Sequence, residues 1–316
     1  MELDKYTELN ILGEGSYGIV YKCQHKQSKA IVAIKKIKNS SDYDSQKIFH
    51  RELKVLKELK HKNIVRLLEA TKKRNIIYLV FEYVENTLLQ EVAKYCGGMD
   101  DALVSTYLNQ ILSAIRYMHI ELGIIHRDLK PENVLVDGNG IKIADFGFAR
   151  KLDKNHRYTE YVATRWYRAP ELLLSSAYDE KVDIFAIGLI AYEMRTGRPL
   201  LPGNSDLDQL ILITKLIGGL SSHQKTLFFK NPCFLGIKFP YNIALPMYHK
   251  LPQFSLEFKE FLDAALAVDP EKRESADELL HLNFVKGFKK YKIRRPFSLP
   301  VLPEKQISTG LIVKIN

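Results

Sequence analysis

Cysteine is scarce in this chain, which has three among 316 residues (Cys23, Cys96 and Cys233), far apart and without a Cys-x-x-Cys pair. A disulfide framework or a zinc site usually needs closely spaced cysteines, so the spacing argues against both and favours a reducing cytosolic or nuclear compartment. Long apolar runs are also lacking, because the longest, residues 184–192, is about half the length needed to cross a bilayer. The first residues show no basic region leading into an apolar run, so we expect no secretory signal and no membrane partner.

Acidic residues are fewer than basic ones: 37 Asp and Glu against 47 Lys and Arg give a net charge of +10. Such an excess raises nucleic acid as a partner. No zinc-finger spacing, aromatic RNA-binding motif or basic zipper supports that idea, so we predict no nucleic-acid partner. The positive charge is expected on solvated helix and loop faces. The basic stretch 286–295 leaves a second interpretation open, a nuclear-import or acidic-partner patch.

The hydrophobic pattern divides the chain into two parts. Residues 9–12, 19–22, 31–37, 64–68 and 76–81 are predicted as strands, with one amphipathic helix over 44–59. After Glu82 the spacing becomes helical, over residues 103–119, 181–194, 206–216, 258–268 and 275–280. We therefore predict an α+β fold in which a β-rich N-terminal lobe (about 4–82) and a larger helical lobe (about 87–287) meet at a hinge near 82–86. A basic tail over 288–316 would follow.

The string His126-Arg-Asp-Leu-Lys-Pro-Glu-Asn133, followed by Asp-Phe-Gly at 145–147, carries the most specific chemistry. It places a carboxylate (Asp128), an ammonium (Lys130) and two oxygen ligands (Asn133 and Asp145) in one short segment. Transfer of a phosphoryl group from ATP needs this set: a carboxylate to orient a hydroxyl, a cation on the moving phosphate, and ligands for magnesium.

A glycine motif near the N-terminus points to the nucleotide. Gly13, Gly15 and Gly18 have the Gly-x-Gly-x-x-Gly spacing, which is weak evidence alone because dinucleotide-binding folds share it. There the glycines open a helix, whereas here a strand is predicted to follow. Glycine is expected because a Cβ would hold the backbone away from the phosphates. Lys35, in the apolar run Val32-Ala-Ile-Lys35, is a charge that needs partners.

These segments, in this order, resemble eukaryotic protein kinases. The resemblance implies ATP and Mg²⁺ as cofactors, and a Lys at position 130 is typical of kinases that act on protein Ser/Thr hydroxyls. It also implies a structural role for Asp183, as an acceptor for the catalytic loop, and for a Glu171–Arg273 pair. The implied catalytic residues are Asp128, Lys130, Lys35 and Glu52; the implied metal ligands are Asn133 and Asp145; the implied nucleotide contacts are Leu12, Gly13, Glu14, Gly15, Ser16, Tyr17, Gly18, Val20, Ala33, Lys35, Phe81 (the gatekeeper position), Glu82, Val84 and Leu135.

The segment Thr159-Glu-Tyr161 resembles the dual-phosphorylation signature of mitogen-activated protein kinases. A phosphate adds nearly two negative charges and recruits arginines. We expect regulation at Thr159 and Tyr161, by autophosphorylation or by an upstream kinase. Two interpretations of Tyr17 remain open: it is a second phosphorylation site, or its side chain simply packs over the glycine motif. The arginines available to the two phosphates are Arg51, Arg127 and Arg150 for Thr159, and Arg165 and Arg168 for Tyr161.

Within the kinases, residues 4–287 resemble the CMGC group and are most similar to the cyclin-dependent kinase-like family. The segments that carry this likeness are 13–18, 145–150, 158–171, 202–210 and 223–232. Residues 46–52 lack the PSTAIRE motif that grips cyclin, so a cyclin partner is not expected. The alternatives are a mitogen-activated or cyclin-dependent kinase, or an inactive nucleotide-binding scaffold. The resemblance adds a ciliary or flagellar association to the cytoplasmic and nuclear expectations.

Overall fold

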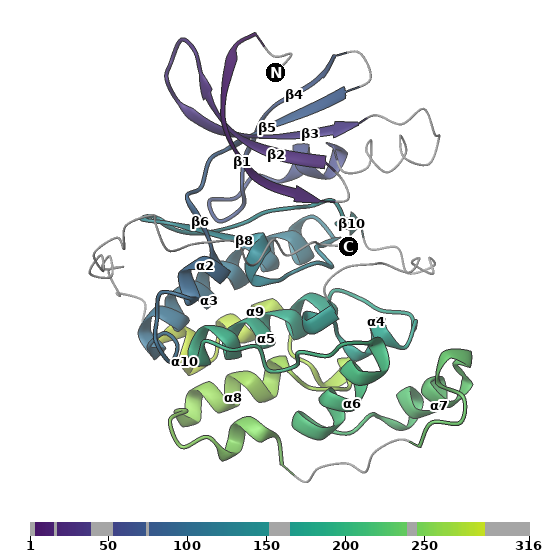
Figure 1. Cartoon of the computed structure of the whole chain (residues 1–316). Coiled ribbons are helices and arrows are strands. Elements are labelled where there is room, and N and C mark those ends of the chain that lie inside the picture. The colour runs from purple at the N-terminus through teal and green to yellow at the C-terminus, as the bar shows by residue number, and fades with distance from the viewer. Residues whose placement is uncertain are drawn as a thin grey trace, which may run out of the picture. The chain divides into compact units, whose positions relative to one another are not determined.

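The computed structural model describes residues 4–15, 18–38, 53–73, 76–151, 165–238 and 245–287 (Figure 1). These residues form two compact units, each described here by itself. The first comprises the described residues up to Leu53 together with Val65–Val84, and the second comprises Lys54–Ile64 and the described residues from Glu85 onward. In this part of the chain, no helix has both the length and the apolar character needed to span a membrane.

The first unit is an antiparallel five-stranded sheet with strand order β1-β2-β3-β5-β4. One face carries a core cluster in which Cys23, Val32, Ile34, Tyr78 and Val80 are buried together. Alternation along each strand puts every second side chain into this core, which is why apolar and β-branched residues recur in β3 and β5. The strands are β1 (Tyr6–Gly15), β2 (Gly18–His25), β3 (Ile31–Lys38), β4 (Leu67–Lys73) and β5 (Ile76–Glu82).

One predicted strand is misplaced. The apolar run 64–68 was expected to be a strand, but β4 begins only at Leu67, and Ile64 instead forms an isolated bridge to Ile143 of the second unit. Ile64 is buried there, so its apolar character reflects packing within the second unit and not pairing in the five-stranded sheet. Residues 53–58 are helical, while the rest of the helix predicted over 44–59 lies largely outside the described residues.

The second unit is built around helix α5 (Lys181–Thr196), whose residues 182–194 are all buried. A helix that is apolar on every side belongs inside a protein, and α3 (Asp101–Arg116) and α8 (Leu256–Ala265) pack against it. Gly188 allows the close approach of α8, because a Cβ there would lie 2.6 Å from a Leu266 methyl. The remaining helices are α2 (Leu88–Val92), α4 (Pro170–Leu173), α6 (Asp206–Leu216), α7 (Ser222–Lys230), α9 (Ala276–Leu280) and α10 (Asn283–Lys286).

The helix predictions differ from the structure at their ends. The helix expected over 258–268 ends at Ala265, and beyond it the carbonyls of Ala267 and Val268 accept side-chain hydrogen bonds from Arg273 and Gln224. The short helices α2 and α7 were not predicted. Both begin with a capping box, formed by Thr87 with Gln90 and by Ser221 with Gln224, and this was the signal available in the sequence.

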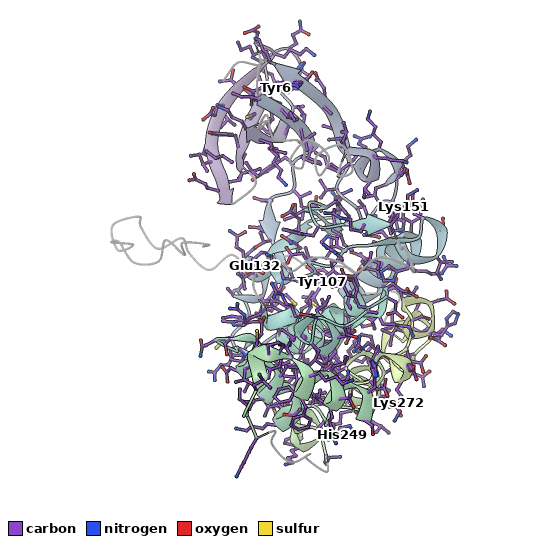
Figure 2. All side chains as sticks on the ribbon, turned by 90° about the vertical axis from the view of Figure 1, so that its right-hand side faces the viewer. Tyr6, Tyr107, Glu132, Lys151, His249 and Lys272 are labelled. Carbon is purple, nitrogen blue, oxygen red and sulfur yellow. The ribbon has the colours of Figure 1, made fainter. Side chains whose placement is uncertain are left out.

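Short strands of the second unit hold the His-Arg-Asp segment. Strand β7 (Ile124–Ile125) precedes it and pairs with β10 (Arg150–Lys151), and β8 (Val134–Asp137) follows it. Strand β8 lies between β6 (Asn86–Thr87) and β9 (Gly140–Ile143). Lys151 of β10, labelled in Figure 2, also pairs with Glu58 at 2.9 Å. The loop 126–133 is therefore fixed at both ends by strand pairing.

Candidate active site

Asp183, near the start of α5, holds the loop 126–133 in place. Its carboxylate accepts hydrogen bonds from the backbone N–H groups of His126 and Arg127, both at 2.8 Å. Arg127 has a φ of 70°, which is strained for a residue with a side chain, and these two bonds help to hold it there. Asp183 is therefore the loop acceptor that the kinase resemblance implied.

The ring of His119 is the third partner of Asp183, with Nε2 2.9 Å from Oδ2. His119 lies in a single π-helical turn, Tyr117–Glu121, at the end of α3, a distortion often found near functional sites. Burial by itself would raise the pKa of Asp183, but the hydrogen bond and charge of His119, together with His126, leave the pKa lowered. The carboxylate is thus stabilised in its ionised form inside the unit.

His126 connects the loop to the Asp-Phe-Gly segment. The buried ring donates from Nε2 to the Ala144 carbonyl at 3.0 Å and packs edge-on against Phe146 at 5.1 Å. Its other nitrogen accepts from the Asp128 N–H at 3.3 Å. One imidazole therefore sets the position of both segments that carry the predicted chemistry.

Asp128, Lys130 and Asn133 form one cluster. The Oδ2 atom of Asp128 accepts from Asn133 Nδ2 at 2.8 Å and lies 3.1 Å from Lys130 Nζ. The same Asn133 nitrogen donates to the Asp128 carbonyl at 2.8 Å. Asp128 is buried, so its carboxylate is fixed by charge-assisted bonds. The cluster presents a carboxylate and an ammonium side by side, as needed to orient a hydroxyl and to attract a phosphoryl group.

Asn133 and Asp145 are brought together by the backbone. The Ala144 N–H donates to the Asn133 carbonyl at 2.8 Å, so the residue before Asp145 is attached directly to Asn133. Asp145 is exposed and has a φ of 58°. Because Asn133 uses its Nδ2 toward Asp128, the amide oxygen is the atom left to meet a cation. A carboxylate and an amide oxygen are hard ligands that fit Mg²⁺.

The first unit carries most of the residues predicted to contact the nucleotide. The register pairs Val20 with Lys35 and Ala33 with Phe81, and residues directly opposite share a face of the sheet. Ala33 and Lys35 are two apart on β3 and so lie on that same face, opposite the buried Val32 and Ile34. Four of the predicted side chains therefore share one surface of the sheet.

The glycine motif has a different structural basis at one position. Gly18 has a φ of 133°, and a Cβ there would lie 2.1 Å from the Lys36 carbonyl oxygen of β3. The absence of a side chain at Gly18 is required by the approach of two strands, and not, as expected from the sequence, by a ligand alone. A Cβ at Gly13 would meet no atom within 4 Å, which leaves that side of the loop open.

Glu82 is fixed by the end of the sheet. Its side chain accepts from the Arg66 N–H at 2.8 Å, and its own N–H donates to the Arg66 carbonyl at 3.1 Å. Any backbone hydrogen bond between Glu82 and a nucleotide must therefore be accepted by the Glu82 carbonyl. Of the predicted contacts, the first unit holds Leu12, Gly13, Glu14, Gly15, Gly18, Val20, Ala33, Lys35, Phe81, Glu82 and Val84, and the second holds Leu135; Ser16, Tyr17, Arg51, Glu52, Thr159 and Tyr161 lie outside the described residues.

Two of the arginines predicted to bind a phosphate on Thr159 donate hydrogen bonds to the backbone carbonyls of two consecutive residues. Arg127 Nε donates to the Phe148 carbonyl at 2.9 Å, and Arg150 Nη1 donates to the Ala149 carbonyl at 2.9 Å. Pairing of β7 with β10 explains this convergence, because Arg150 lies opposite Ile125. Arg127 Nη1 also donates to the Tyr178 hydroxyl at 2.5 Å, a partner that sequence reasoning missed.

Arg165 and Arg168 share an acidic partner. Asp206, the first residue of α6, lies 2.9 Å from Arg165 Nε and 3.8 Å from Arg168 Nη1. Sequence analysis assigned these two arginines to Tyr161 and did not anticipate Asp206. Asp206 lies about forty positions further along the chain than the two arginines, so no local sequence pattern indicated this pairing.

Glu171 and Arg273 form the predicted ion pair. Arg273 Nη1 and Nη2 reach the two carboxylate oxygens at 2.7 and 3.3 Å, and both side chains are buried. The guanidinium also lies 5.0 Å from the ring of Phe185. Phe185 therefore offers an aromatic face to Arg273.

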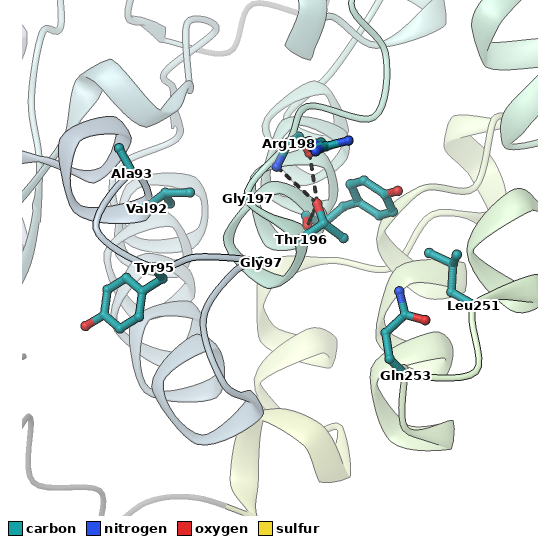
Figure 3. Close-up of a pocket in the computed structure, with 10 residues that line it drawn as sticks. Val92, Ala93, Tyr95, Gly97, Thr196, Gly197, Arg198, Leu251 and Gln253 are labelled. Atoms are coloured by element: carbon teal, nitrogen blue, oxygen red, sulfur yellow. Dashed lines mark hydrogen bonds between the residues drawn. The ribbon is translucent and has the colours of Figure 1, made fainter.

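A cavity elsewhere in the second unit is not part of this site. Figure 3 shows a pocket of about 400 Å³ between the end of α2 and the end of α5, lined among others by Val92, Tyr95, Thr196 and Leu251. None of its lining residues was predicted to bind nucleotide, metal or phosphate.

Residues 6–285 match the family described as protein kinase domain. The chain belongs to the protein kinase family. Cyclin-dependent kinase-like 2 of Oryctolagus cuniculus is 47% identical over 287 residues, 89% of this chain and 50% of that protein. Cyclin-dependent kinase-like 4 of Mus musculus is 40% identical over 297 residues, 93% of this chain and 86% of that protein.

Cyclin-dependent kinase-like 5 of Homo sapiens is 48% identical over 242 residues, 75% of this chain and 25% of that protein. These relatives agree with the resemblance to the cyclin-dependent kinase-like family and with a bilobal kinase fold. The chain spans about half the length of the cyclin-dependent kinase-like 2 protein that it matches.

Proposed function

We propose that this kinase transfers the γ-phosphate of Mg·ATP to Ser and Thr hydroxyls of protein substrates. The observation that carries the proposal is the cluster of Asp128, Lys130 and Asn133, tied through Ala144 to Asp145. All the side chains that phosphoryl transfer requires in this loop are present and in mutual contact or adjacent.

Four residues of the second unit carry the chemistry of this proposal. Asp128 accepts or orients the proton of the substrate hydroxyl, and Lys130 neutralises charge on the transferred phosphoryl group. Asn133 and Asp145 hold the magnesium ion, which supplies further neutralisation of the phosphates when bound. Lys130 lies two residues after Asp128, which is typical of kinases with Ser/Thr substrates, and this supports the choice of acceptor.

The residues of the first unit bind the nucleotide. Lys35 reaches the α- and β-phosphates and pairs with Glu52, and the glycine motif covers the phosphates. Leu12, Val20 and Ala33 of the sheet contact the adenine. The shared face of Val20, Ala33, Lys35 and Phe81 supports this assignment.

Activity is regulated by phosphorylation of Thr159 and Tyr161. The convergence of Arg127 and Arg150 on the Phe148 and Ala149 carbonyls supports a phosphate receptor for Thr159. Arg165 and Arg168 are the receptors for Tyr161, and a phosphate there competes with Asp206 for the same guanidinium groups. Either autophosphorylation or an upstream kinase supplies the modification.

The test is transfer of labelled phosphate from ATP to a degenerate Ser/Thr peptide library. The protein is first produced in a eukaryotic host and confirmed by mass spectrometry to be phosphorylated at Thr159 and Tyr161. Asp128→Asn should lower kcat by about 10²–10⁴-fold, and Asp145→Asn should abolish the dependence on magnesium together with most of the activity.

The matched control is Asp4→Asn, which removes an exposed carboxylate that lies 3.7 Å from Lys73. Its activity should equal that of the wild type. Absence of transfer by the doubly phosphorylated wild type, with ATP binding intact, would support the inactive scaffold instead. Equal transfer by Asp145→Asn would contradict the proposed role of Asp145 as a magnesium ligand.

A further inference from the structure

Helix α7 and the turn after it are anchored to the helical unit by buried contacts. The helix starts with the Ser221–Gln224 capping box, and Gln224 Nε2 donates to the buried Val268 carbonyl at 2.8 Å. Phe228 is fully buried, and Phe234 of the following 3₁₀ turn stacks on it with ring centroids 4.9 Å apart. Figure 1 shows α7 at the edge of this unit, beyond α6. Buried contacts therefore hold this segment in place.

Two large apolar side chains of this segment are exposed to solvent. Phe229 is 58% exposed and Leu235 is 71% exposed. Phe229 packs edge-on against Phe228 at 5.5 Å, and Leu235 follows Phe234 directly in the chain. Single exposed apolar residues are ordinary, but two that are held on one short and well-anchored element resemble a docking surface.

The charge of this element has one sign. Residues 221–238 contain Lys225, Lys230 and Lys238 and no Asp or Glu. Lys225 lies one helical turn before Phe229 and so on the same face, and Lys230 follows Phe229 directly. Within the described ranges, none of the three lysines has an ion pair. We refer to these five residues, Lys225, Phe229, Lys230, Leu235 and Lys238, as the α7 patch.

We propose that the α7 patch docks a short acidic segment of a partner protein that carries apolar side chains between its carboxylates. Complementary charge is the argument for this occupant, because three lysines without described partners would each gain one. Phe229 and Leu235 supply the apolar anchors, and their fixed positions reduce the entropy lost on binding. The patch is small, so the complex is expected to be weak and transient.

Other occupants fit the charges less well. The chain's own segment 288–316 carries seven Lys and Arg against one Glu, so it would be repelled. A second copy of the chain brings another net charge of +10. An anionic membrane would attract the lysines, but α7 has nine residues and directs Phe228 inward, which leaves too little apolar surface for insertion.

The experiment measures binding of immobilised peptide libraries to the whole protein, without ATP. In the test library, Asp and Glu alternate with Leu, Ile and Phe in all arrangements. Control libraries replace the acidic residues with Asn and Gln, replace the apolar residues with Ala, or replace the acidic residues with Lys. Selective binding of acidic–apolar peptides that weakens as salt rises is the expected result.

Three variants assign the binding to the patch. Reversing its charge with Lys225→Glu/Lys230→Glu/Lys238→Glu should weaken binding of the best peptides by about tenfold or more. Phe229→Ser/Leu235→Ser should weaken it by about fivefold or more while retaining the lysines. The matched control, Lys60→Glu/Lys62→Glu/Lys286→Glu, makes the same change in net charge at exposed lysines elsewhere and should bind like the wild type.

Two native cysteines report the location independently. Cys233 and Cys96 are both free and exposed, but only Cys233 lies between the two apolar residues of the patch in the chain. A bound peptide should slow alkylation of Cys233, measured by mass spectrometry, and leave the rate at Cys96 unchanged. Melting temperatures of the variants show that each is folded.

The outcomes separate clearly. Binding of no acidic–apolar peptide above the control libraries overturns the proposal, as does equal loss of binding in the matched control. Binding to phosphatidylserine vesicles that requires the patch, without peptide binding, identifies a membrane as the occupant and overturns it too. Because no step uses ATP, these results are independent of whether phosphoryl transfer is found.

Discussion

At the scale of single residues, two buried carboxylates of α5 have opposite electrostatic roles. Asp183 is surrounded by donors, and its pKa is lowered despite the burial that would raise it. Burial raises the pKa of Glu193, the nearby Glu132 adds to this, and the Tyr167 hydroxyl at 2.5 Å opposes it only in part. The fold thus stabilises the ionised form of Asp183 and the protonated form of Glu193, although both lie on the same helix.

Asp183→Asn should both destabilise the protein and disorder the catalytic loop. The amide would turn a donor toward backbone N–H groups, and removing a partner from a buried charged network costs about 3 kcal/mol. Since the folded pKa is depressed, the stabilisation by Asp183 is present above its unfolded pKa and is lost as pH falls through the folded pKa. The difference in Tm between wild type and variant, measured by thermal denaturation, should therefore shrink in acid. A constant difference would contradict this.

Glu193→Gln should show the reverse pH dependence. Because the folded pKa is raised, the stabilising contribution of Glu193 is present below its unfolded pKa and is lost as pH rises through the folded pKa. Glutamine keeps an acceptor for Tyr167 without the buried charge. We expect the variant to melt above the wild type at neutral pH, with the gap closing toward pH values of about 4. The exposed Glu257→Gln should shift Tm little at either pH, and a lower Tm for Glu193→Gln at neutral pH would refute the assignment.

At the scale of elements, the helical unit joins distant segments through buried side chains. Arg273 attaches the residues after α8 to α4 through Glu171 and to α5 through the Lys181 carbonyl at 2.7 Å. Asp183 attaches α5 to the catalytic loop, and His126 attaches the loop to Phe146. The position of Asp128 therefore depends on helices that contribute nothing to the chemistry.

Arg273→Lys should destabilise this arrangement strongly although it preserves the charge. A lysine cannot donate to both oxygens of Glu171 and also to the three carbonyls that the guanidinium of Arg273 contacts. A poorly paired buried carboxylate costs about 3 kcal/mol or more. We expect Tm to fall by about 5 °C or more in a thermal scan. Arg198→Lys, at an exposed arginine with no ion pair in the described ranges, is the control. Equal shifts for both variants would mean that the bidentate geometry contributes nothing.

At the scale of the whole molecule, residues 6–285 form a protein kinase domain with an overall positive charge, within a chain that spans about half of one of its relatives. Most of the proposed nucleotide contacts belong to the first compact unit, and the proposed metal ligands belong to the second. Binding and metal dependence can therefore be separated experimentally.

Mg·ATP should raise the Tm of the whole protein, because a ligand that binds only the folded state stabilises it by about 2.7 kcal/mol at one hundred times its Kd. Chelation of magnesium with EDTA should remove most of the increase. Lys35→Met should weaken the effect with or without metal, while Asp145→Asn should abolish only the part that requires magnesium. An ATP effect that is equal in EDTA would contradict the roles of Asn133 and Asp145.

The sequence by itself determined what is local: the strands β1, β2, β3 and β5, the main helices, and the motifs that bear Asp128, Lys130, Asn133, Asp145 and Lys35. Those features depend on periodicity and on residue types at short spacing, which a linear pattern records. The partners Asp183 and Arg273 were also anticipated, through the family resemblance. Tertiary structure alone decided the rest: that Ile64 bridges to Ile143 instead of joining the five-stranded sheet, that Gly18 serves the contact with β3, and that Tyr178 and Asp206 bind the arginines. The reason is that contacts between segments far apart in the chain are selected by the packing of the whole unit, and no single segment encodes both partners.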